Sequence, residues 1–484
     1  MKKFKSLFAV LFAVLFLPWF SACFIGSKDK SFYDVQAELV GDTLNGVETV
    51  TFYNDSDNAF SVLKFNLYAN AFRKDAVYSP ISAQYYYRAY EKGESYGNID
   101  ILSVKSGENQ LTFSVGGVDQ NVLTVELKDE VFPDETAEVS IEFSVKLANV
   151  VARTGINDKT INLANFYPIL CGITDGNFVE CPYYSLGDPF FSDVADYRVQ
   201  FTCDAKYTVA AGGKEVFSET VGDKTVRKFT AENSRSFAIV LSENFETKTA
   251  QVDGITVKYF YFNDSDSDET LNDAVSALKY FSDTFGEYPY DVFSVVQTEF
   301  VQGGMEFSSL VFVSSDLERK AYREVVVHET AHQWWQAAVG NNEITHAFID
   351  EGLAEYSVVL FYENHPEYGF TRENLIKSTE QTYKVFCSVY QKILGEVNTV
   401  MLRSLDQFKS EYEYVNIAYV KSCIMFDYLR QTIGDDNFFS GLRRFYAENK
   451  FSCVTEAELI GAFERTGADS NGFFNSFLNG SVIL

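Results

Sequence analysis

Two histidines and two glutamates in this chain are spaced so that they could form a catalytic zinc site. His328 and His332 enclose Glu329 in the pentapeptide His-Glu-Thr-Ala-His, and Glu351 follows in the run Asp-Glu-Gly-Leu-Ala-Glu-Tyr. At 3.6 residues per turn, positions four apart lie about 40° apart on a helix, so both imidazoles can reach one metal ion. Glu329 lies beside them, where it could take a proton from water. A third ligand, Glu351, leaves one tetrahedral position open, which is typical of catalytic zinc.

The composition argues against a chance origin of this motif. The chain has four histidines among 484 residues, so a random His-Glu-x-x-His is expected in about 0.5% of such chains or fewer. The surrounding residues also predict a helix over 318–339, with charged residues early, an apolar run at 325–327 and Gly340 after its end. The sequence therefore predicts a zinc metallopeptidase that binds one Zn²⁺ per chain.

Four motifs in a fixed order make the chain resemble the aminopeptidase N family of zinc metallopeptidases, in the gluzincin group. Besides the two zinc-binding motifs, residues 303–307 (Gly-Gly-Met-Glu-Phe) are similar to the family's Gly-x-Met-Glu-Asn exopeptidase motif. Residues 419–422 (Tyr-Val-Lys-Ser) are similar to its Tyr-x-Lys-Gly motif. The resemblance implies that Tyr419 is catalytic together with Glu329. It also implies substrate binding by four residues, which are Gly303, Gly304, Met305 and Glu306.

The chemistry of an aminopeptidase gives both added motifs a purpose. A carboxylate beside the scissile bond can bind the free ammonium group of a substrate by a charge-assisted hydrogen bond, which fits Glu306. Attack of water on the peptide carbonyl creates an oxyanion, and a neutral tyrosine hydroxyl is suited to stabilise it, which fits Tyr419. Because the chain has 30 tyrosines, only the motif singles out Tyr419, and Tyr414 is the reserve candidate.

Three features depart from the family pattern. Phe307 stands where the family has asparagine, which removes a polar contact near the substrate backbone. Ser422 stands where the family has glycine, which crowds the helix slightly. No counterpart is evident for the glutamine that family members contribute from their N-terminal domain to the substrate ammonium. We therefore expect looser selection for free N-termini than in the family.

The start of the chain resembles a bacterial lipoprotein signal. Three lysines precede an apolar stretch over residues 7–20, and Ser-Ala precedes Cys23. Residues 1–22 would be a signal peptide, Cys23 the lipidated N-terminus and residues 23–30 a short tether. The chain would then be an exported lipoprotein of the bacterial cell membrane that faces outside the cytoplasm. An uncleaved transmembrane anchor is the alternative, but the apolar stretch is shorter than the ~20 residues that span a bilayer.

The formal charge of −28 predicts repulsion from nucleic acid and from anionic lipid. The expected partners are therefore peptides with a free N-terminus and, through the lipid anchor, the membrane. No nucleic acid partner is expected, and the oligomeric state is open.

Six cysteines follow Cys23, and an even number in an exported protein permits disulfides, above all between Cys171 and Cys181. Buried thiols fit the apolar contexts of the later cysteines equally well.

The pattern of the chain changes once and predicts an α+β multidomain protein. Short β-type runs separated by Gly, Asn and Asp turns fill residues 31–263, which predicts an antiparallel β domain like the saddle-shaped N-terminal domain of the family. Helical periodicity dominates residues 264–484, which predicts a thermolysin-like, mainly helical zinc peptidase domain. The acidic run 264–269 fits a polar linker and a helix N-cap better than a calcium site.

Two further features concern the active-site cleft. Residues 165–196 resemble the part of the N-terminal domain that faces the cleft in the family. Because the sequence stops at Leu484, the resemblance implies a short form that lacks the family's large C-terminal helical domain and has a more open cleft.

The sequence thus predicts a zinc aminopeptidase that removes N-terminal residues from peptides by attack of metal-activated water. A zinc endopeptidase or tripeptidase-like enzyme with the same site is one alternative, and cleavage of N-acetylated peptides would distinguish it. A catalytically silent, peptide-binding lipoprotein is the other alternative, although binding alone would not require Glu329.

Overall fold

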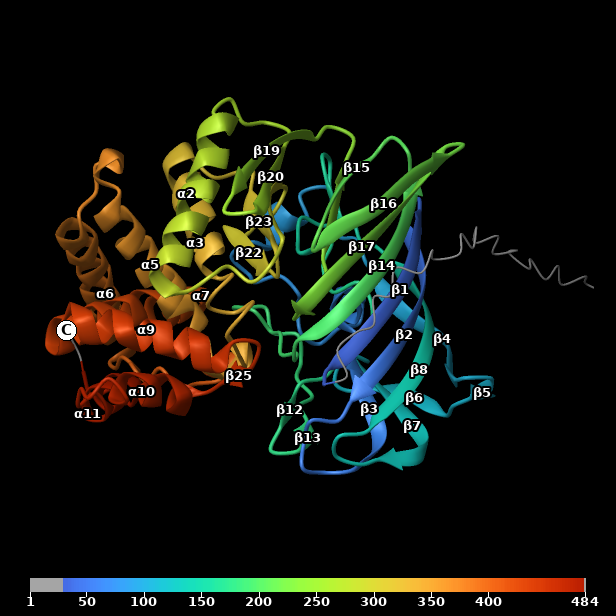
Figure 1. Cartoon of the computed structure of the whole chain (residues 1–484), viewed down its shortest axis with the longest axis horizontal. Helices are drawn as coiled ribbons and strands as arrows, with labels where there is room; N and C mark the ends of the chain where they lie inside the picture. The colour runs from blue at the N-terminus through green and yellow to red at the C-terminus, as the bar shows by residue number, and fades with distance from the viewer. Residues whose placement is uncertain (1–28, 483–484) are drawn as a thin grey trace, which may run out of the picture.

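A computed structural model describes residues 29–482 of the chain (Figure 1). The predicted signal peptide over residues 1–22, the lipidated Cys23 and the tether up to residue 28 lie outside the described residues. No helix within residues 29–482 is both long and apolar enough to cross a membrane.

The N-terminal part is built on an eight-stranded sheet with a concave shape (Figure 1). Along its strands Ser31–Val40 and Thr136–Lys146 buried positions alternate with more exposed ones, because side chains of a strand point to opposite faces and only one face meets the core. Its strands, in spatial order, are β16 (Lys214–Val221), β17 (Lys224–Ser234), β14 (Ala195–Asp204), β1 (Ser31–Val40), β2 (Thr43–Tyr53), β8 (Thr136–Lys146), β4 (Asn98–Ser106) and β5 (Asn109–Gln110). All neighbours pair antiparallel except β1 and β14, which pair parallel because β1 inserts between β2 and β14.

Two smaller sheets and a hairpin complete this part, which we call the β half (residues 29–245). One four-stranded sheet consists of β15 (Thr208–Ala211), β18 (Ile239–Ser242), β10 (Ile161–Leu163) and β9 (Thr154–Ile156). The other consists of β11 (Ile169–Leu170), β3 (Phe60–Asn66), β7 (Val122–Val131) and β6 (Phe113–Gly116). The remaining elements are the hairpin β12 (Ile173–Thr174) and β13 (Asn177–Phe178), the 3₁₀ turn Tyr68–Phe72 and helix α1 (Tyr86–Ala89).

The rest of the chain, which we call the helical half (residues 246–482), begins with a five-stranded mixed sheet. In spatial order its strands are β19 (Glu246–Val252), β20 (Ile255–Tyr261), β21 (Val292–Thr298), β23 (Leu310–Ser314) and β22 (Gly304–Phe307). Strands β20, β21 and β23 are parallel, whereas β19 and β22 pair antiparallel at the two edges. All residues of β21 and β23 are buried. This sheet therefore starts before residue 264, where the composition changes.

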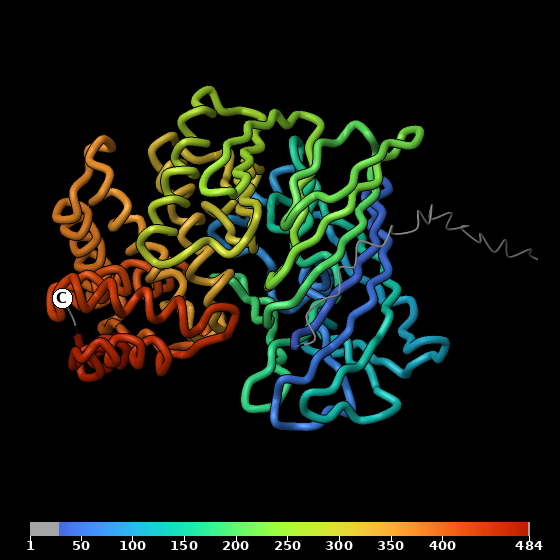
Figure 2. Tube along the Cα trace, in the orientation of Figure 1, coloured from blue at the N-terminus to red at the C-terminus, as the bar shows by residue number. Residues whose placement is uncertain are grey.

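Helices follow this sheet and lie on the side away from the β half, as the yellow-to-red trace of Figure 2 shows. Their bounds are α2 (Ser267–Phe285), α3 (Arg319–Ala331), α4 (Glu343–His346), α5 (Asp350–Asn364), α6 (Arg372–Leu394), α7 (Glu411–Tyr414), a π-helix (Val415–Lys421), α8 (Ser422–Ile433), α9 (Asp435–Asn449), α10 (Glu456–Glu464) and α11 (Asn471–Leu478). Short 3₁₀ turns cover Pro366–Tyr368 and Leu405–Gln407, and strands β24 (Gly340–Asn341) and β25 (Cys453–Val454) pair with each other. The predicted α+β organisation is confirmed.

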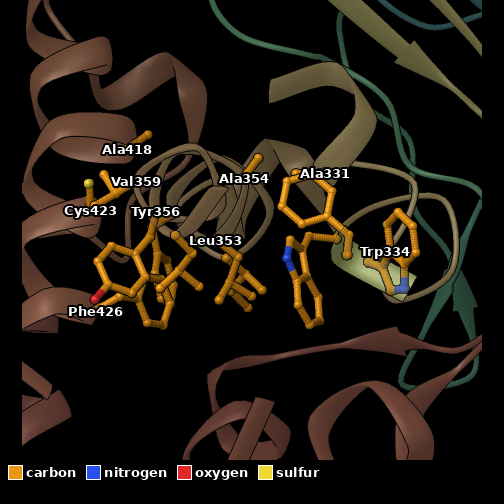
Figure 3. Packing of buried hydrophobic residues seen from close by; sticks show 14 of the residues in the cluster. Ala331, Trp334, Leu353, Ala354, Tyr356, Val359, Ala418, Cys423 and Phe426 are labelled. Atoms are coloured by element: carbon orange, nitrogen blue, oxygen red, sulfur yellow. The ribbon is translucent and has the colours of Figure 1, made fainter. Parts of the chain in front are cut away.

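Helix α5 lies at the centre of the helical core. Its side chains Leu353, Ala354 and Tyr356 are buried among residues of α3, α8 and the π-helix, part of which Figure 3 shows. A helix that is apolar on nearly every side must be enclosed by other elements. Gly352 permits the close approach of α8, because a Cβ atom there would lie 2.4 Å from Cβ of Ser422. The serine that replaces the family's glycine therefore packs against a glycine of α5.

Two predicted elements differ from the structure. The helix expected over residues 318–339 ends at Ala331, because the chain then turns into the core with Trp334 and Trp335 buried. Gln336 has a φ of 143°, which no helical residue adopts. In the region 264–484, for which the sequence predicts helices, the segment Val415–Lys421 is a π-helix before α8.

The acidic run at residues 264–269 stabilises the start of a helix. Asp264 accepts hydrogen bonds from the amide of Asp266 and from Oγ1 of Thr270, 2.9 Å and 2.6 Å away, and so stabilises the start of α2. All six cysteines within the described residues are free thiols.

Candidate active site

The two histidines and Glu351 converge between α3 and α5. His328 lies in the last turn of α3, His332 directly follows that helix, and Glu351 lies in the first turn of α5. The two Nε2 atoms are 3.0 Å apart. Glu351 Oε2 lies 3.4 Å from Nε2 of His328 and 3.2 Å from Nε2 of His332. Apart from these two imidazoles, this buried oxygen has no hydrogen-bond partner within the described chain.

These distances fit a tetrahedral zinc ion. With bonds of about 2.0–2.1 Å, two ligand atoms of tetrahedral zinc lie about 3.3 Å apart. The other ring nitrogens are already engaged, because Nδ1 of His332 lies 3.0 Å from the carbonyl oxygen of Trp335 and Nδ1 of His328 lies 3.3 Å from Oε2 of Glu355. Such contacts fix the ring orientation and leave both Nε2 atoms free for a metal. The residues present therefore fit zinc.

The charges around His328, His332 and Glu351 also favour a bound cation. Although burial opposes a charge on the imidazole, the hydrogen bonds to Glu351 and Glu355 raise the pKa of His328 to about 10. Burial likewise opposes ionisation of Glu351, but hydrogen bonds from both histidines lower its pKa to about 2. The site thus stabilises positive charge beside an ionised carboxylate, and a divalent ion supplies such charge.

Glu329 lies against the edge strand β22. Its side chain is 4% exposed, and its Oε2 atom has no hydrogen-bond partner. Burial raises its pKa to about 7, although the neighbouring histidines oppose this shift. Gly304 makes room for it, because a Cβ atom at that position would lie 2.1 Å from Oε1 of Glu329. The glycine of the predicted substrate motif is therefore also needed to accommodate the predicted base.

Side chains along β22 point alternately to its two faces, which explains the orientation of the predicted substrate-binding residues. Met305 and Phe307 point into an apolar cluster with Phe312, whereas Gly304 and Glu306 face the cleft. Phe307 is 3% exposed and its ring lies 5.0 Å from that of Phe312. The phenylalanine that replaces the family's asparagine thus serves the core of the sheet.

Tyr419 reaches the predicted metal ligands from the π-helix. Its hydroxyl donates a hydrogen bond to Oε1 of Glu351, and its ring stacks on that of His328 at 6.0 Å. Burial and the charge of Glu351 raise the pKa of Tyr419 well above its usual value, so its hydroxyl stays a neutral donor. Tyr414, the reserve candidate, packs edge-on against Tyr419 at 5.7 Å. Tyr414 ends α7 and Tyr419 lies in the π-helix that follows, and π-helical segments are frequent at functional sites.

The β half contributes two charged residues that sequence reasoning missed. Arg153 donates hydrogen bonds to the carboxylate of Asp188 and, at 3.1 Å, to the carbonyl oxygen of Gly187. Both side chains line the cleft, and the guanidinium lies over the ring of Phe300 at 5.9 Å. The segment 165–196, which resembles a cleft-facing part of the family's N-terminal domain, contains Asp188, but nothing singled out this residue and no local signal marked Arg153 as its partner.

The cleft between the two halves is a cavity of about 510 Å³. It brings together all the predicted catalytic, metal and substrate residues in the described chain except Met305, which lies beneath β22. Besides the two histidines, the described residues that line it include seven carboxylates but only one arginine and one lysine, Arg153 and Lys320. The acidic side chains are Asp188, Glu306, Glu324, Glu329, Glu351, Glu355 and Glu411. This charge balance favours a substrate that carries a positive group.

Fold and site together define a metal-dependent peptidase class. Residues 269–477 match the family model described as "Peptidase family M1 domain". This part of the chain is therefore similar to the peptidase family M1 domain. Aminopeptidase N of Lactococcus lactis subsp. lactis is 25% identical over 236 residues, which are 44% of this chain and 26% of that protein. The match thus spans about a quarter of the length of that relative.

Solved structures share the fold across both halves. An M1 zinc metallopeptidase from Deinococcus radiodurans superposes with a TM-score of 0.65 and 17% identity, over 95% of this chain and 96% of that one. A mutant of that metallopeptidase bound to a Tyr-Ser-Ala substrate has the same score and identity, over 94% and 95% of the two chains. These likenesses show the fold.

Proposed function

We propose that the chain is a zinc-dependent aminopeptidase that removes single N-terminal residues from peptides. The observation that carries this proposal is Glu306, a buried carboxylate that faces the same cleft as the zinc ligands and Glu329. No lysine or arginine within residues 29–482 forms an ion pair with it. A buried carboxylate requires a cationic partner or a proton, and the free ammonium group of a peptide is such a partner.

The residues of the cleft have complementary tasks in this proposal. When bound by His328, His332 and Glu351, zinc would polarise the scissile carbonyl and lower the pKa of the attacking water. Glu329 lies beside these ligands, where it takes the proton of the attacking water and passes it to the leaving amine. Tyr419 holds a neutral hydroxyl that can turn from Glu351 to the oxyanion that develops on the carbonyl.

Selection for a free N-terminus would depend on the charges around Glu306. Glu306 and the Arg153–Asp188 pair line the cavity and together carry two carboxylates and one guanidinium. Their net charge is negative, so an ammonium group is attracted whereas an acetylated terminus offers no charge. The substrate-bound structure of the related metallopeptidase, which holds Tyr-Ser-Ala, supports a short peptide as ligand.

The cellular location is a separate part of the proposal. We infer from residues 1–23 that the protein is exported and held at the bacterial membrane by a lipid on Cys23. Mass spectrometry of the membrane fraction tests this, since the lipid is expected on the peptide that begins with Cys23. A chain that begins with Met1 and carries no lipid would contradict it.

The decisive experiment compares free and N-acetylated aminoacyl substrates. We expect one zinc ion per chain and cleavage of the free amines alone, with kcat lost in Glu329→Gln while zinc stays bound. Glu306→Gln should lower kcat/KM for free amines by about 10–100-fold, the range for loss of a hydrogen bond to a charged group. Glu367→Gln, an exposed glutamate, is the matched control.

The outcomes separate the alternatives. Cleavage of N-acetylated peptides at a comparable rate would indicate an endopeptidase or tripeptidase-like enzyme with the same zinc site. Bound zinc and peptide affinity without turnover would indicate a silent peptide-binding lipoprotein.

A further inference from the structure

A second cluster of buried carboxylates lies behind the zinc site. Glu306 of β22, Glu343 of α4 and Asp350 of α5 each place a carboxylate oxygen within 4.8 Å of the others. None is more than 4% exposed. In residues 29–482 none of the three forms an ion pair with a lysine or arginine. Only Glu306 also lines the large cleft, so the other two are not explained by the proposed reaction.

Two amide side chains are oriented around these carboxylates. Gln336 donates from Nε2 to Oε1 of Glu343 at 2.9 Å, and Asn341 donates from Nδ2 to Oδ1 of Asp350 at 3.1 Å. Because their NH₂ groups are used in this way, their oxygens remain as acceptors. Gln336 also has a φ of 143°, a strained conformation for a residue with a side chain.

Four buried oxygens of this cluster have no partner within the described chain. They are Oε1 of Glu306, Oε2 of Glu343, Oε1 of Gln336 and Oδ1 of Asn341. The four residues line one small cavity of about 20 Å³, enough for one water or one ion. The set contains acceptors alone, so hydrogen bonds among its members cannot satisfy it.

Either protons or a cation must compensate the charge of the cluster. All three carboxyls are buried, so their ionised forms are costly without a partner. Protons on the carboxyls would neutralise them and could donate to the amide oxygens, but each proton satisfies only one acceptor. A single cation would satisfy carboxylates and amide oxygens together.

We propose that this cluster binds a calcium ion next to the zinc site. Calcium takes six to eight oxygen ligands at about 2.3–2.6 Å, so ligand atoms up to about 4.8 Å apart can share one ion. The cluster supplies carboxylate and amide oxygens only, which disfavours zinc. Magnesium keeps several waters in its shell, and a cavity of about 20 Å³ has no room for them.

One nearby positive charge does not replace the ion. Arg235 also lines the small cavity, but its guanidinium donates to the carbonyl oxygens of Gln336, Ser192 and Ser452. None of these acceptors is a carboxylate, so Arg235 neutralises none of the three acids by a direct hydrogen bond.

The proposed ion would link the cluster to the cleft through Glu306. An ion on Oε1 of Glu306 keeps that carboxylate ionised while its other oxygen faces the substrate. Calcium binding itself does not depend on peptidase activity, whereas this effect on the substrate ammonium rests on the proposed function. We therefore expect calcium to lower KM for free-amine substrates and to leave zinc content unchanged.

Calorimetric titration with CaCl₂ of the zinc-loaded, chelator-treated protein tests the site directly. We expect one calcium ion per chain, and affinity at least tenfold weaker in Glu343→Gln and in Asp350→Asn. Glu48→Gln is the matched control, because it removes a buried carboxyl from the β half and should bind calcium as the wild type does. Retained zinc and an unchanged circular dichroism spectrum show that each variant is folded.

The titration is repeated in Glu329→Gln without substrate, so that calcium binding is judged apart from catalysis. Saturable binding that both cluster variants weaken supports the proposal even if no peptide is cleaved. Absence of saturable binding up to millimolar calcium overturns it, as does equal affinity in the wild type and in both variants. Either result would mean that the three carboxyls share protons instead.

Discussion

At the scale of single residues, the site shows how one carboxylate can serve two partners. Glu351 presents Oε2 to both histidines and Oε1 to the hydroxyl of Tyr419. The tyrosine is therefore held next to the metal ligands without being one of them. Its removal should change the reaction rate and spare the metal.

We predict that Tyr419→Phe lowers kcat by about 10²–10³-fold, the usual loss when one oxyanion donor is removed. KM and zinc content should stay near wild-type values, because Oε2 of Glu351 and both histidines are untouched. Steady-state kinetics and metal analysis measure the two effects. Tyr412→Phe, an exposed tyrosine of α7, is the control. If Tyr419→Phe kept full kcat, Tyr414 would become the candidate donor.

At the scale of elements, an unpartnered acid stands out in the large sheet. Glu48 of β2 is 0% exposed, and neither of its carboxylate oxygens has a hydrogen-bond partner in the described chain. Burial raises its pKa well above the usual value, so the folded protein holds this proton to a higher pH than the unfolded chain does. The unfolded chain releases this proton above pH ~4.3.

The sign of the resulting pH dependence follows from proton binding. Between pH ~4.3 and the raised folded pKa, the folded state binds the extra proton, so stability falls as pH rises. The loss is at most about 1.4 kcal/mol per pH unit from this one group. Glu48→Gln should therefore be more stable than the wild type at pH 7 and show a flatter pH dependence from pH 5 to 7. Urea unfolding at both pH values measures this, and equal slopes for the two proteins would contradict it.

Elements and local motifs were predictable to different degrees. The spacing of His328 and His332 is set within one helix, so the sequence alone revealed it. The end of α3 at Ala331 was missed, because burial of Trp334 and Trp335 redirects the chain there and no local stop signal marks it. The π-helix around Tyr419 was missed for a similar reason, since helical periodicity does not distinguish it from an α-helix.

Contacts across the whole molecule were the least predictable part of the site. Asp188 and Arg153 meet across 35 positions of sequence, and Glu343 joins Glu306 only through the packing of α4 behind β22. No periodicity or motif encodes such pairs, because each depends on how sheets and helices stack. The cleft is therefore a property of both halves together, and its geometry should depend on the contacts that join them.

Arg235 is a principal link between the halves. From the end of β17 its guanidinium donates to the carbonyl oxygens of Gln336 and Ser452 at 2.7 Å and 2.6 Å. Gly340 is required beside it, because a Cβ atom there would lie 2.1 Å from Cζ of Arg235. A planar guanidinium can donate to several carbonyls in fixed directions at once, whereas a lysine ammonium cannot reproduce this geometry.

We predict that Arg235→Lys lowers the free energy of unfolding by about 2–3 kcal/mol, the range for losing hydrogen bonds from a buried charged group. The cleft should loosen as well, so kcat/KM is expected to fall about tenfold or more although Arg235 touches no substrate. Thermal unfolding and peptide kinetics measure the two effects. Arg227→Lys is the matched control, because Arg227 lies on the same strand and bonds only to Tyr207 and Cys203 of the β half. Equal stability and equal kcat/KM in both variants would show that apolar contacts alone hold the two halves in register.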